Sequence, residues 1–255
     1  MGATKEWLME MQEVQYEESR AEWIRRELND DDADETTEGW QELVDQYDKT
    51  IRDYEDAIYD EYSWYHDQDY SNALISFQQS INDIESILRS NINPTVVDTI
   101  YKMSYVHMVT VLETYLADTL KFLVFKNDQY LANAVKNLKE IKDRSLKPID
   151  VFLDKKIVEK IVTEQLSKYL YHDVVKVLEI YKHCLDFKNT YELKEVIHAT
   201  AVRHDLVHRN GKRKDGTSVQ LDLNQLKSSL ASIKNFVRYL DKELLDYREK
   251  EAEGL

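Results

Sequence analysis

The chain has 255 residues, of which 42% are hydrophobic and 33% are charged, and its formal net charge is −15. Its five glycines and two prolines are too few for a fold rich in β-turns, because hairpin turns need residues with positive φ or a fixed turn geometry. A single cysteine, Cys184, excludes an internal disulfide framework and a cysteine-based metal cluster. Its apolar surroundings predict a small buried side chain. The composition therefore predicts an all-α protein.

The charge is concentrated in the first part of the chain. Residues 1–70 contain 23 acidic and 6 basic residues, a net charge of −17, whereas residues 71–255 contain 26 acidic and 28 basic residues, a net charge of +2. All four tryptophans also lie in the first segment. Because simple disordered acidic tails are poor in aromatic residues, we predict two parts: an acidic, Trp-containing helical extension over residues 1–70 and a helical domain over residues 71–255.

Within the acidic extension, helices are predicted near residues 5–28 and 38–66, separated by the acidic run of residues 29–32. In the second helix, aromatic and aliphatic side chains recur at helical intervals at Tyr47, Tyr54, Ile58 and Tyr62. This pattern is typical of a solvated acidic helical pair that packs on the main domain. A second interpretation is that the extension screens or regulates a basic active site by imitating phosphate charge.

No targeting or membrane-spanning segment is evident in the sequence. The first residues lack the apolar run of a signal peptide, and Glu6 stands where a myristoylation motif requires Ser or Thr. No stretch approaches the roughly 18 apolar residues of a membrane span. We therefore expect a cytoplasmic protein with no membrane partner.

Helical patterns continue through residues 71–255. A helix is predicted over 72–90, before the Asn93-Pro94 punctuation, and the long stretch 95–126 is dense in apolar residues and is expected to be mostly buried. The last helix has an unbroken alternation of three- and four-residue spacings, which is typical of a packing seam in a helical bundle. This seam consists of Leu223, Leu226, Leu230, Ile233, Val237, Leu240 and Leu244. Further helices are predicted over 128–143, 149–169 (opened by Pro148), 172–186 and 190–207.

Near the end of the 190–207 helix the chain reads Arg203-His204-Asp205-Leu206-Val207-His208-Arg209-Asn210-Gly211. This string, an arginine followed after four residues by a histidine in the form Arg-His-x-x-Val-His-Arg-x-Gly, resembles the signature of the HEPN family. The stretch Glu113-Thr114-Tyr115-Leu116 is similar to a Glu-x-Tyr-Leu stretch on an earlier helix of related proteins. The resemblance covers roughly residues 95–250. It implies a helical bundle of the HEPN type, with residues 203–208 at the end of a long helix that is followed by a loop and a final helix.

The resemblance implies a metal-independent endoribonuclease without a cofactor. RNA carries its own nucleophile, the 2′-hydroxyl, so the enzyme has to move protons and stabilise charge at phosphorus. An imidazole near neutral pKa suits the proton transfer, which makes His208 the candidate general acid and base. A guanidinium can donate two parallel hydrogen bonds to phosphoryl oxygens, which makes Arg203 the candidate phosphate clamp. The resemblance also suggests that Glu113 orients Arg203, with an ordinary polar residue as the alternative.

Helical geometry constrains how this motif is used. Arg203 and His208 are five residues apart and differ by about 140° in direction on an ideal α-helix. Either the helix ends before His208, or a second copy of the chain completes the site. The resemblance implies the second option, so we expect a homodimer with an isologous interface. His204 lies nearer the middle of the apolar stripe and is expected either to face the core or to take part in the site directly. The stripe flanked by Arg203 and His208 consists of Leu193, Val196, Ile197 and Val207.

The loop after the motif is the densest basic patch of the chain. Beside a phosphate site, its side chains are candidate contacts to the RNA backbone, and the alternative is a solvated mobile loop held by two glycines. Asp205 and Arg209 stand four residues apart, a spacing that predicts an ion pair on the helix surface. The candidate RNA-binding residues are Arg209, Asn210, Lys212, Arg213 and Lys214.

Parts of the motif are also compatible with two other functions, a metal site and a non-catalytic binding module. His204 and His208 form a His-x3-His pair that can hold zinc, but no local Glu completes the His-Glu-x-x-His pattern of metalloproteases, so no metal site is predicted. The main alternative is a non-catalytic module that binds RNA, a nucleotide or another protein, and the intact Arg203 and His208 pair favours catalysis over it. For an active enzyme, the resemblance implies a toxin-like or antiviral defence effector, restrained by an antitoxin or another regulatory protein.

Overall fold

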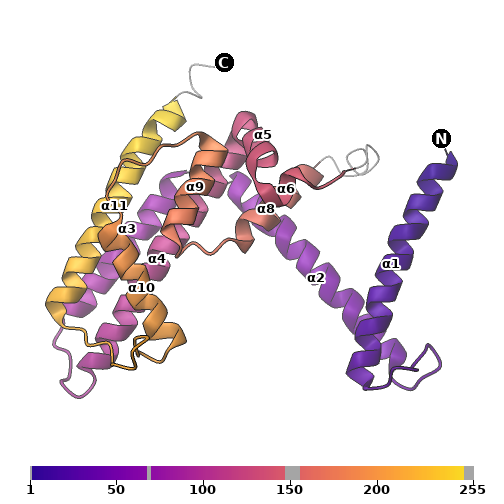
Figure 1. Cartoon of the computed structure of the whole chain (residues 1–255), viewed down its shortest axis with the longest axis horizontal. Coiled ribbons are helices and arrows are strands. Elements are labelled where there is room, and N and C mark those ends of the chain that lie inside the picture. Colours follow the sequence, from indigo (N-terminus) through magenta and orange to yellow (C-terminus); the bar gives the residue numbers. More distant parts are fainter. Residues whose placement is uncertain (1, 68–69, 147–155, 250–255) are drawn as a thin grey trace. The chain divides into compact units, whose positions relative to one another are not determined.

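The computed structural model describes residues 2–67, 70–146 and 156–249 (Figure 1). These residues contain ten α-helices and no β-strand, which confirms the predicted all-α class. The chain divides into two compact units: the first contains the residues up to Glu61 together with the described part of Leu146–Ile157, and the second runs from Tyr62 to Ser145 and from Val158 onward. No helix among the described residues combines the length and the apolar character needed to span a bilayer.

The first unit is a helical hairpin. Helix α1 (Gly2–Leu28) and helix α2 (Trp40–Asp67) are joined by residues 29–39, and the chain leaves α1 through Asn29 and enters α2 through Gly39, both at positive φ. Its buried cluster is small, with Ile24, Ala33 and Trp40 at the centre. This cluster closes the end of the hairpin where the acidic loop lies.

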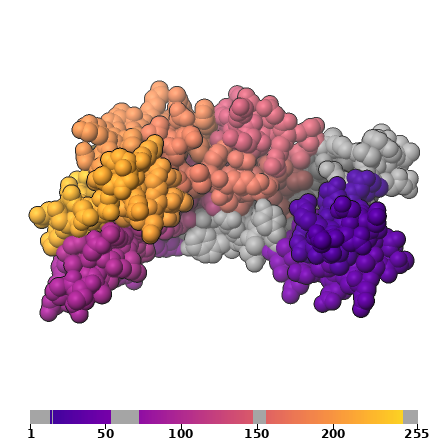
Figure 2. Space-filling model, turned by 60° about the horizontal axis from the view of Figure 1, so that its bottom comes forward, coloured from indigo at the N-terminus to yellow at the C-terminus, as the bar shows by residue number. Residues whose placement is uncertain are grey.

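Polar and aromatic contacts link the two helices farther along the hairpin. Asp48 of α2 accepts a hydrogen bond from the Tyr16 hydroxyl at 2.9 Å and forms an ion pair with Arg20 at 3.2 Å. The ring of Tyr47 packs against Tyr16 and Trp23, with centroid distances of 5.8 and 5.5 Å. Most of the described side chains of this hairpin are nevertheless exposed. Figure 2 draws the surface of the hairpin in indigo. The predicted positions Tyr54, Ile58 and Tyr62 lie outside the described side chains.

Helix α4 (Val97–Lys126) forms the centre of the second unit. Most side chains of α4 between Ser104 and Val124 are buried, as predicted for this stretch, and one stripe of the helix is exposed at Met103, His107, Thr110 and Thr114. The helix packs against five others. These are α3 (Tyr70–Arg89), α5 (Asp128–Asn137), α9 (Val174–Leu185), α10 (Lys194–His208) and α11 (Leu223–Glu249).

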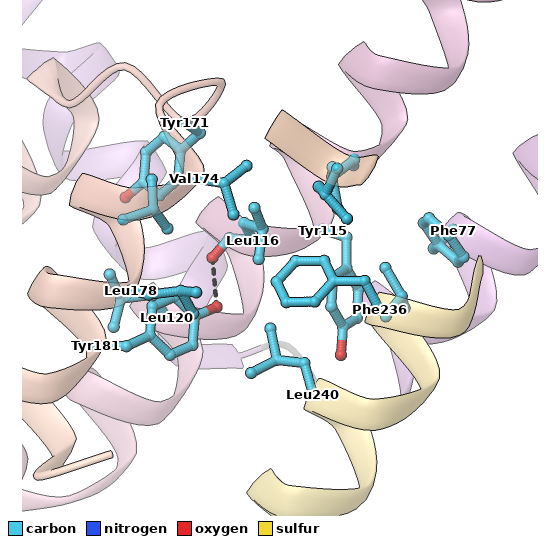
Figure 3. Packing of buried hydrophobic residues seen from close by; sticks show 14 of the residues in the cluster. Phe77, Tyr115, Leu116, Leu120, Tyr171, Val174, Leu178, Tyr181, Phe236 and Leu240 are labelled. Carbon is cyan, nitrogen blue, oxygen red and sulfur yellow. Dashed lines mark hydrogen bonds between the residues drawn. The ribbon is translucent and has the colours of Figure 1, made fainter. Parts of the chain in front are cut away.

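The core around α4 joins aromatic and aliphatic side chains from these helices (Figure 3). The buried hydroxyl of Tyr181 donates a hydrogen bond to the carbonyl oxygen of Leu116 at 2.7 Å, which fixes α9 against α4. Cys184 is fully buried in this core, and burial raises the pKa of its thiol to about 12, so it is the small buried side chain that was predicted. The seam predicted for the last helix is confirmed, because its side chains from Leu226 to Leu244 are buried.

Two predicted helices differ from the structure. The region 128–143 forms two helices, α5 and α6 (Lys139–Lys142), because Leu138 between them is extended, with φ −75° and ψ 118°, and its side chain is buried. Burial of this leucine breaks the helical path that the local pattern suggests. Of the predicted helix 149–169, the later part is α8 (Ile157–Lys168), and residues 147–155, with Pro148, lie outside the described residues.

Candidate active site

Helix α10 carries the motif, and its buried face differs from the predicted stripe. Val196, Ala199 and Thr200 are buried, whereas Ile197 and Val207 are 41% and 45% exposed. The predicted stripe is therefore right at Val196 and Leu193, which packs against the core, and wrong at Ile197 and Val207. Because positions 196, 199, 200 and 203 follow the i, i+3, i+4, i+7 pattern of one helix face, the buried face continues to Arg203, whose guanidinium points toward α4.

The guanidinium of Arg203 meets the carboxylate of Glu113, which lies in the middle of α4. Arg203 Nε lies 3.5 Å from Glu113 Oε1, and the two side chains are only 16% and 18% exposed. Both atoms are buried without a hydrogen-bond partner within the described structure. Burial raises the pKa of Glu113, while the charges of Arg203 and His172 lower it. The pair is thus an ion pair in a partly desolvated place, at a distance longer than a hydrogen bond.

His172 is a neighbour of this pair that the sequence did not indicate. It lies in the short connection between α8 and α9, and its Nδ1 is 3.9 Å from the same Glu113 oxygen. Its charge also lowers the pKa of His204, so it lies within electrostatic range of the motif helix. A histidine in a turn, 31 positions before Arg203, has no spacing signal that would link it to the motif.

His204 and His208 lie together on the next face of α10. Their ring centroids are 4.8 Å apart and the rings are tilted by 41°, as expected for residues four apart on a helix. His208 is exposed and His204 is partly exposed, so the expectation that His204 faces the core is wrong. Partial burial lowers the pKa of His204, and the neighbouring charges of Arg209 and His208 lower it further. This favours a neutral imidazole at position 204.

Helix α10 ends at His208, which excludes the option that it ends before this residue. Asn210 and Gly211 adopt positive φ values of 52° and 73°, and the amides of Arg209 and Gly211 both donate to the carbonyl oxygen of Asp205, at 3.2 and 3.0 Å. The predicted ion pair between Arg209 and Asp205 is present. Arg209 is therefore paired with a carboxylate within the chain, and its charge is partly neutralised before any RNA binds.

The basic loop is a short hairpin rather than an irregular loop. Lys212 and Ser218 form an antiparallel bridge, Val219 N donates to Gly211 O at 2.8 Å and Arg213 N donates to Thr217 O at 2.8 Å. The buried side chain of Val219 anchors the returning segment of this hairpin. Three basic side chains remain exposed on the hairpin: Lys212, Arg213 and Lys214.

A groove with a volume of ≈ 500 Å³ continues the seam between α4 and α10. Met103, Val106 and Thr110 line it from α4, while Leu206 and Asn210 line it from the motif segment. Val106 and Thr110 lie on the same face of α4 as Glu113, because they precede it by seven and three residues. The groove therefore begins about one helical turn from the Glu113–Arg203 pair.

The structure thus brings Glu113, Arg203, His204 and His208 to one region of the second unit and adds His172 to them. No set of three or more His, Cys, Asp or Glu side chains in the described ranges is arranged to hold a metal ion. Comparisons of the chain with protein-family models, with curated proteins and with solved structures find no match.

Proposed function

We propose that this chain is a metal-independent endoribonuclease of the HEPN type. The observation that carries the proposal is the pairing of a partly buried Arg203 with Glu113 next to the neighbouring imidazoles of His204 and His208. A guanidinium held by a carboxylate is pre-oriented for a phosphate, and imidazoles are the side chains best suited to move protons near neutral pH. The basic hairpin that follows supplies exposed positive charge next to these groups.

The proposed reaction uses the 2′-hydroxyl of RNA as the nucleophile. An imidazole takes the hydroxyl proton, the 2′-oxygen attacks phosphorus, and the bond from phosphorus to the 5′-oxygen breaks as that oxygen receives a proton. His204, whose lowered pKa favours the neutral form, fits the role of base, and His208 fits the role of acid. Arg203 stabilises the negative charge that develops on the phosphoryl oxygens. The products carry a 2′,3′-cyclic phosphate and a free 5′-hydroxyl.

The path of the RNA follows from the exposed charge. Lys212, Arg213 and Lys214 extend from the hairpin and are assigned to the RNA backbone, where such contacts position the strand without reading its bases. Asn210 lines the groove beside α4 and can reach either backbone or base. Arg209 is assigned mainly to its ion pair with Asp205, which stiffens the end of the motif helix.

The directions in which Arg203 and His208 project from α10 favour an assembly of two copies of the chain. Because α10 is helical through His208, Arg203 and His208 project about 140° apart and do not share one face. We therefore propose that a second copy of the chain completes each site in a homodimer with an isologous interface. The biological role that fits such an enzyme is a cytoplasmic toxin-like or antiviral defence effector, restrained by an antitoxin or another regulatory protein.

The test is incubation of the full chain with a mixed panel of RNAs, with and without EDTA. We expect cleavage that survives EDTA and falls by about 10²- to 10⁴-fold in His208→Ala and comparably in Arg203→Ala. His198→Gln is the matched control, because His198 is an exposed histidine on the same helix outside the motif. If the folded wild-type protein cuts no RNA but binds it through these residues, the function is that of a non-catalytic RNA-binding module.

A further inference from the structure

His172 is held in place by both of its neighbours in the chain. The buried Tyr171 donates its hydroxyl to the carbonyl oxygen of Leu166 at 2.9 Å, which fixes the chain on one side of the histidine. Asp173 caps α9, because its side chain accepts a hydrogen bond from the amide of Lys176, and its own amide donates to Leu170 O at 3.0 Å. The backbone on both sides of His172 is thus tied to α8 and α9, so the fold determines where the side chain begins.

The imidazole and the guanidinium approach one carboxylate oxygen from different elements. Glu113 Oε1 lies 3.9 Å from His172 Nδ1 and 3.5 Å from Arg203 Nε. That oxygen is buried and has no hydrogen bond from any described residue. Both distances exceed the 2.7–3.2 Å of a formed hydrogen bond, so the three groups are arranged as an ion-pair cluster that has not closed. Catalytic contacts are often long before a substrate is bound and tighten around it.

We propose that His172 is a positioning residue of the site: it holds the Glu113 carboxylate, which in turn orients the Arg203 guanidinium toward a phosphate. This inference rests on the ribonuclease function proposed above and extends it to a residue outside the motif. With Glu113 and Arg203 alone, the two charges cancel. A protonated His172 makes the cluster positive by one charge, which favours an incoming phosphate.

Charged groups from several elements surround the cluster. Glu113 faces Arg203 from α10 and His172 from the connection before α9. His204, with His208, Asp205 and Arg209 beside it, lies on the other side of Arg203 along α10. Burial raises the pKa of Glu113 and the charge of His172 lowers it, so a protonated His172 favours the ionised carboxylate that the guanidinium needs.

The first test reads Glu113 directly and needs no RNA. In protein labelled with ¹³C at the glutamate carboxyl groups, the Glu113 signal is assigned by its absence in Glu113→Gln and is followed through a pH titration. We expect His172→Gln to raise the pKa of Glu113 further, because the substitution removes a positive charge that lowers it. His198→Gln is expected to leave it unchanged. An unchanged Glu113 titration in a folded His172→Gln protein overturns the proposal, whether or not the protein cuts RNA.

The second test reads the phosphate end of the cluster with an RNA that cannot be cut. The probe is an oligonucleotide with 2′-O-methyl groups at every position, bound to the full chain at low salt between about pH 5 and pH 8. We expect His172→Gln to weaken binding about fivefold at the acidic end, the scale of one partly screened charge pair, and to match wild type at the alkaline end. His172→Lys keeps a positive charge throughout and is expected to bind tightly across the range.

The two tests separate this inference from the proposed function. Failure of the wild-type protein to cut any RNA sinks the ribonuclease proposal alone, since the uncut probe still reports on His172. Equal affinity of wild type and His172→Gln for the probe at every pH overturns the positioning role. A loss that is the same at all pH values and is not restored by His172→Lys also overturns it, because that pattern indicates a structural side chain.

Discussion

The two units of the chain are both helical but are stabilised on very different scales. The hairpin of the first unit has a buried cluster centred on Ile24, Ala33 and Trp40, and its remaining contacts are exposed or partly buried pairs such as Arg20 with Asp48. The second unit surrounds α4 with one large core that takes side chains from most of its helices. A small core leaves a unit marginally stable, whereas a large, close-packed core holds its side chains in defined rotamers. The Glu113–Arg203 pair lies in the unit that can hold it still.

The acidic residues of the two units also differ in their surroundings. In the hairpin, Asp34 is exposed and its carboxylate accepts hydrogen bonds from the amide and the hydroxyl of Thr36 at 2.9 and 2.6 Å. In the bundle, Glu113 is largely buried and its Oε1 accepts no hydrogen bond among the described residues. The hairpin therefore carries its excess of negative charge at little cost, while the bundle holds a carboxylate whose burial is costly. A costly buried charge is typical of a functional position.

The largest effect is expected from a substitution in the bundle core. Leu120 of α4 is fully buried, and Leu120→Ala should lower the free energy of unfolding by about 2–5 kcal/mol, because it removes buried methyl groups and leaves a cavity. Urea denaturation followed by far-ultraviolet circular dichroism measures this loss. Ile75→Ala on α3 is the matched control, since Ile75 is 54% exposed, and a loss of similar size there would contradict the assignment of the core.

A smaller and more local effect is expected in the hairpin. Trp40 is 7% exposed and Arg25 lies over its ring at 5.9 Å, so Trp40→Ala removes the largest side chain of a small cluster. We expect a loss of up to about 3 kcal/mol, at the low end for aromatic truncation, confined to the first unit. The indole NMR signal of Trp23 should then report a loosened hairpin, while the urea midpoint of the bundle stays where it was. A shift of the bundle midpoint would show that the two units unfold together.

The comparison also shows what a sequence can predict. The buried helix 95–126 and the seam of α11 follow from apolar spacing alone, because large cores impose long and regular patterns. The break at Leu138 does not follow from spacing, since a leucine fits a helix and only its burial shows why the chain is extended there. The stripe predicted on α10 is wrong at Ile197 and Val207, which are apolar yet exposed, because folded proteins expose many apolar side chains.

The contacts of the candidate site also fall into two kinds: those that local spacing predicts and those that only tertiary packing creates. His204 and His208 are four residues apart, so the helix period alone predicts that they lie close together. The contact of Arg203 with Glu113 crosses from α10 to α4, and it was suggested by a family resemblance rather than by spacing. His172 comes from a third segment, and only tertiary packing brings it within 3.9 Å of Glu113. Residues that meet through packing alone leave no periodic signal in one sequence.

The smallest predicted effect is the pH dependence of stability, which differs between Glu113 and Asp34. Burial raises the pKa of Glu113 above its ordinary value, whereas hydrogen bonds from Thr36 hold the pKa of Asp34 below its ordinary value. A group whose pKa is raised by folding contributes stability that is present at acidic pH and is lost as pH rises through the raised pKa, while a group whose pKa is lowered contributes stability that is lost as pH falls. The two carboxylates should therefore give opposite pH slopes.

Unfolding of wild type, Glu113→Gln and Asp34→Asn between about pH 3 and pH 6 measures these slopes. As pH rises, wild type should lose stability relative to Glu113→Gln, because the carboxylate that burial penalises becomes ionised. Arg203 is charged throughout this range, so the loss of its partner in the variant adds a constant and leaves the slope unchanged. For Asp34→Asn, read by the Trp40 indole signal, wild type should lose its advantage as pH falls. If stability depends on pH with the same sign for both carboxylates, the partners of Glu113 stabilise its charge more than burial penalises it. In that case Arg203 is held more tightly than its distance of 3.5 Å suggests.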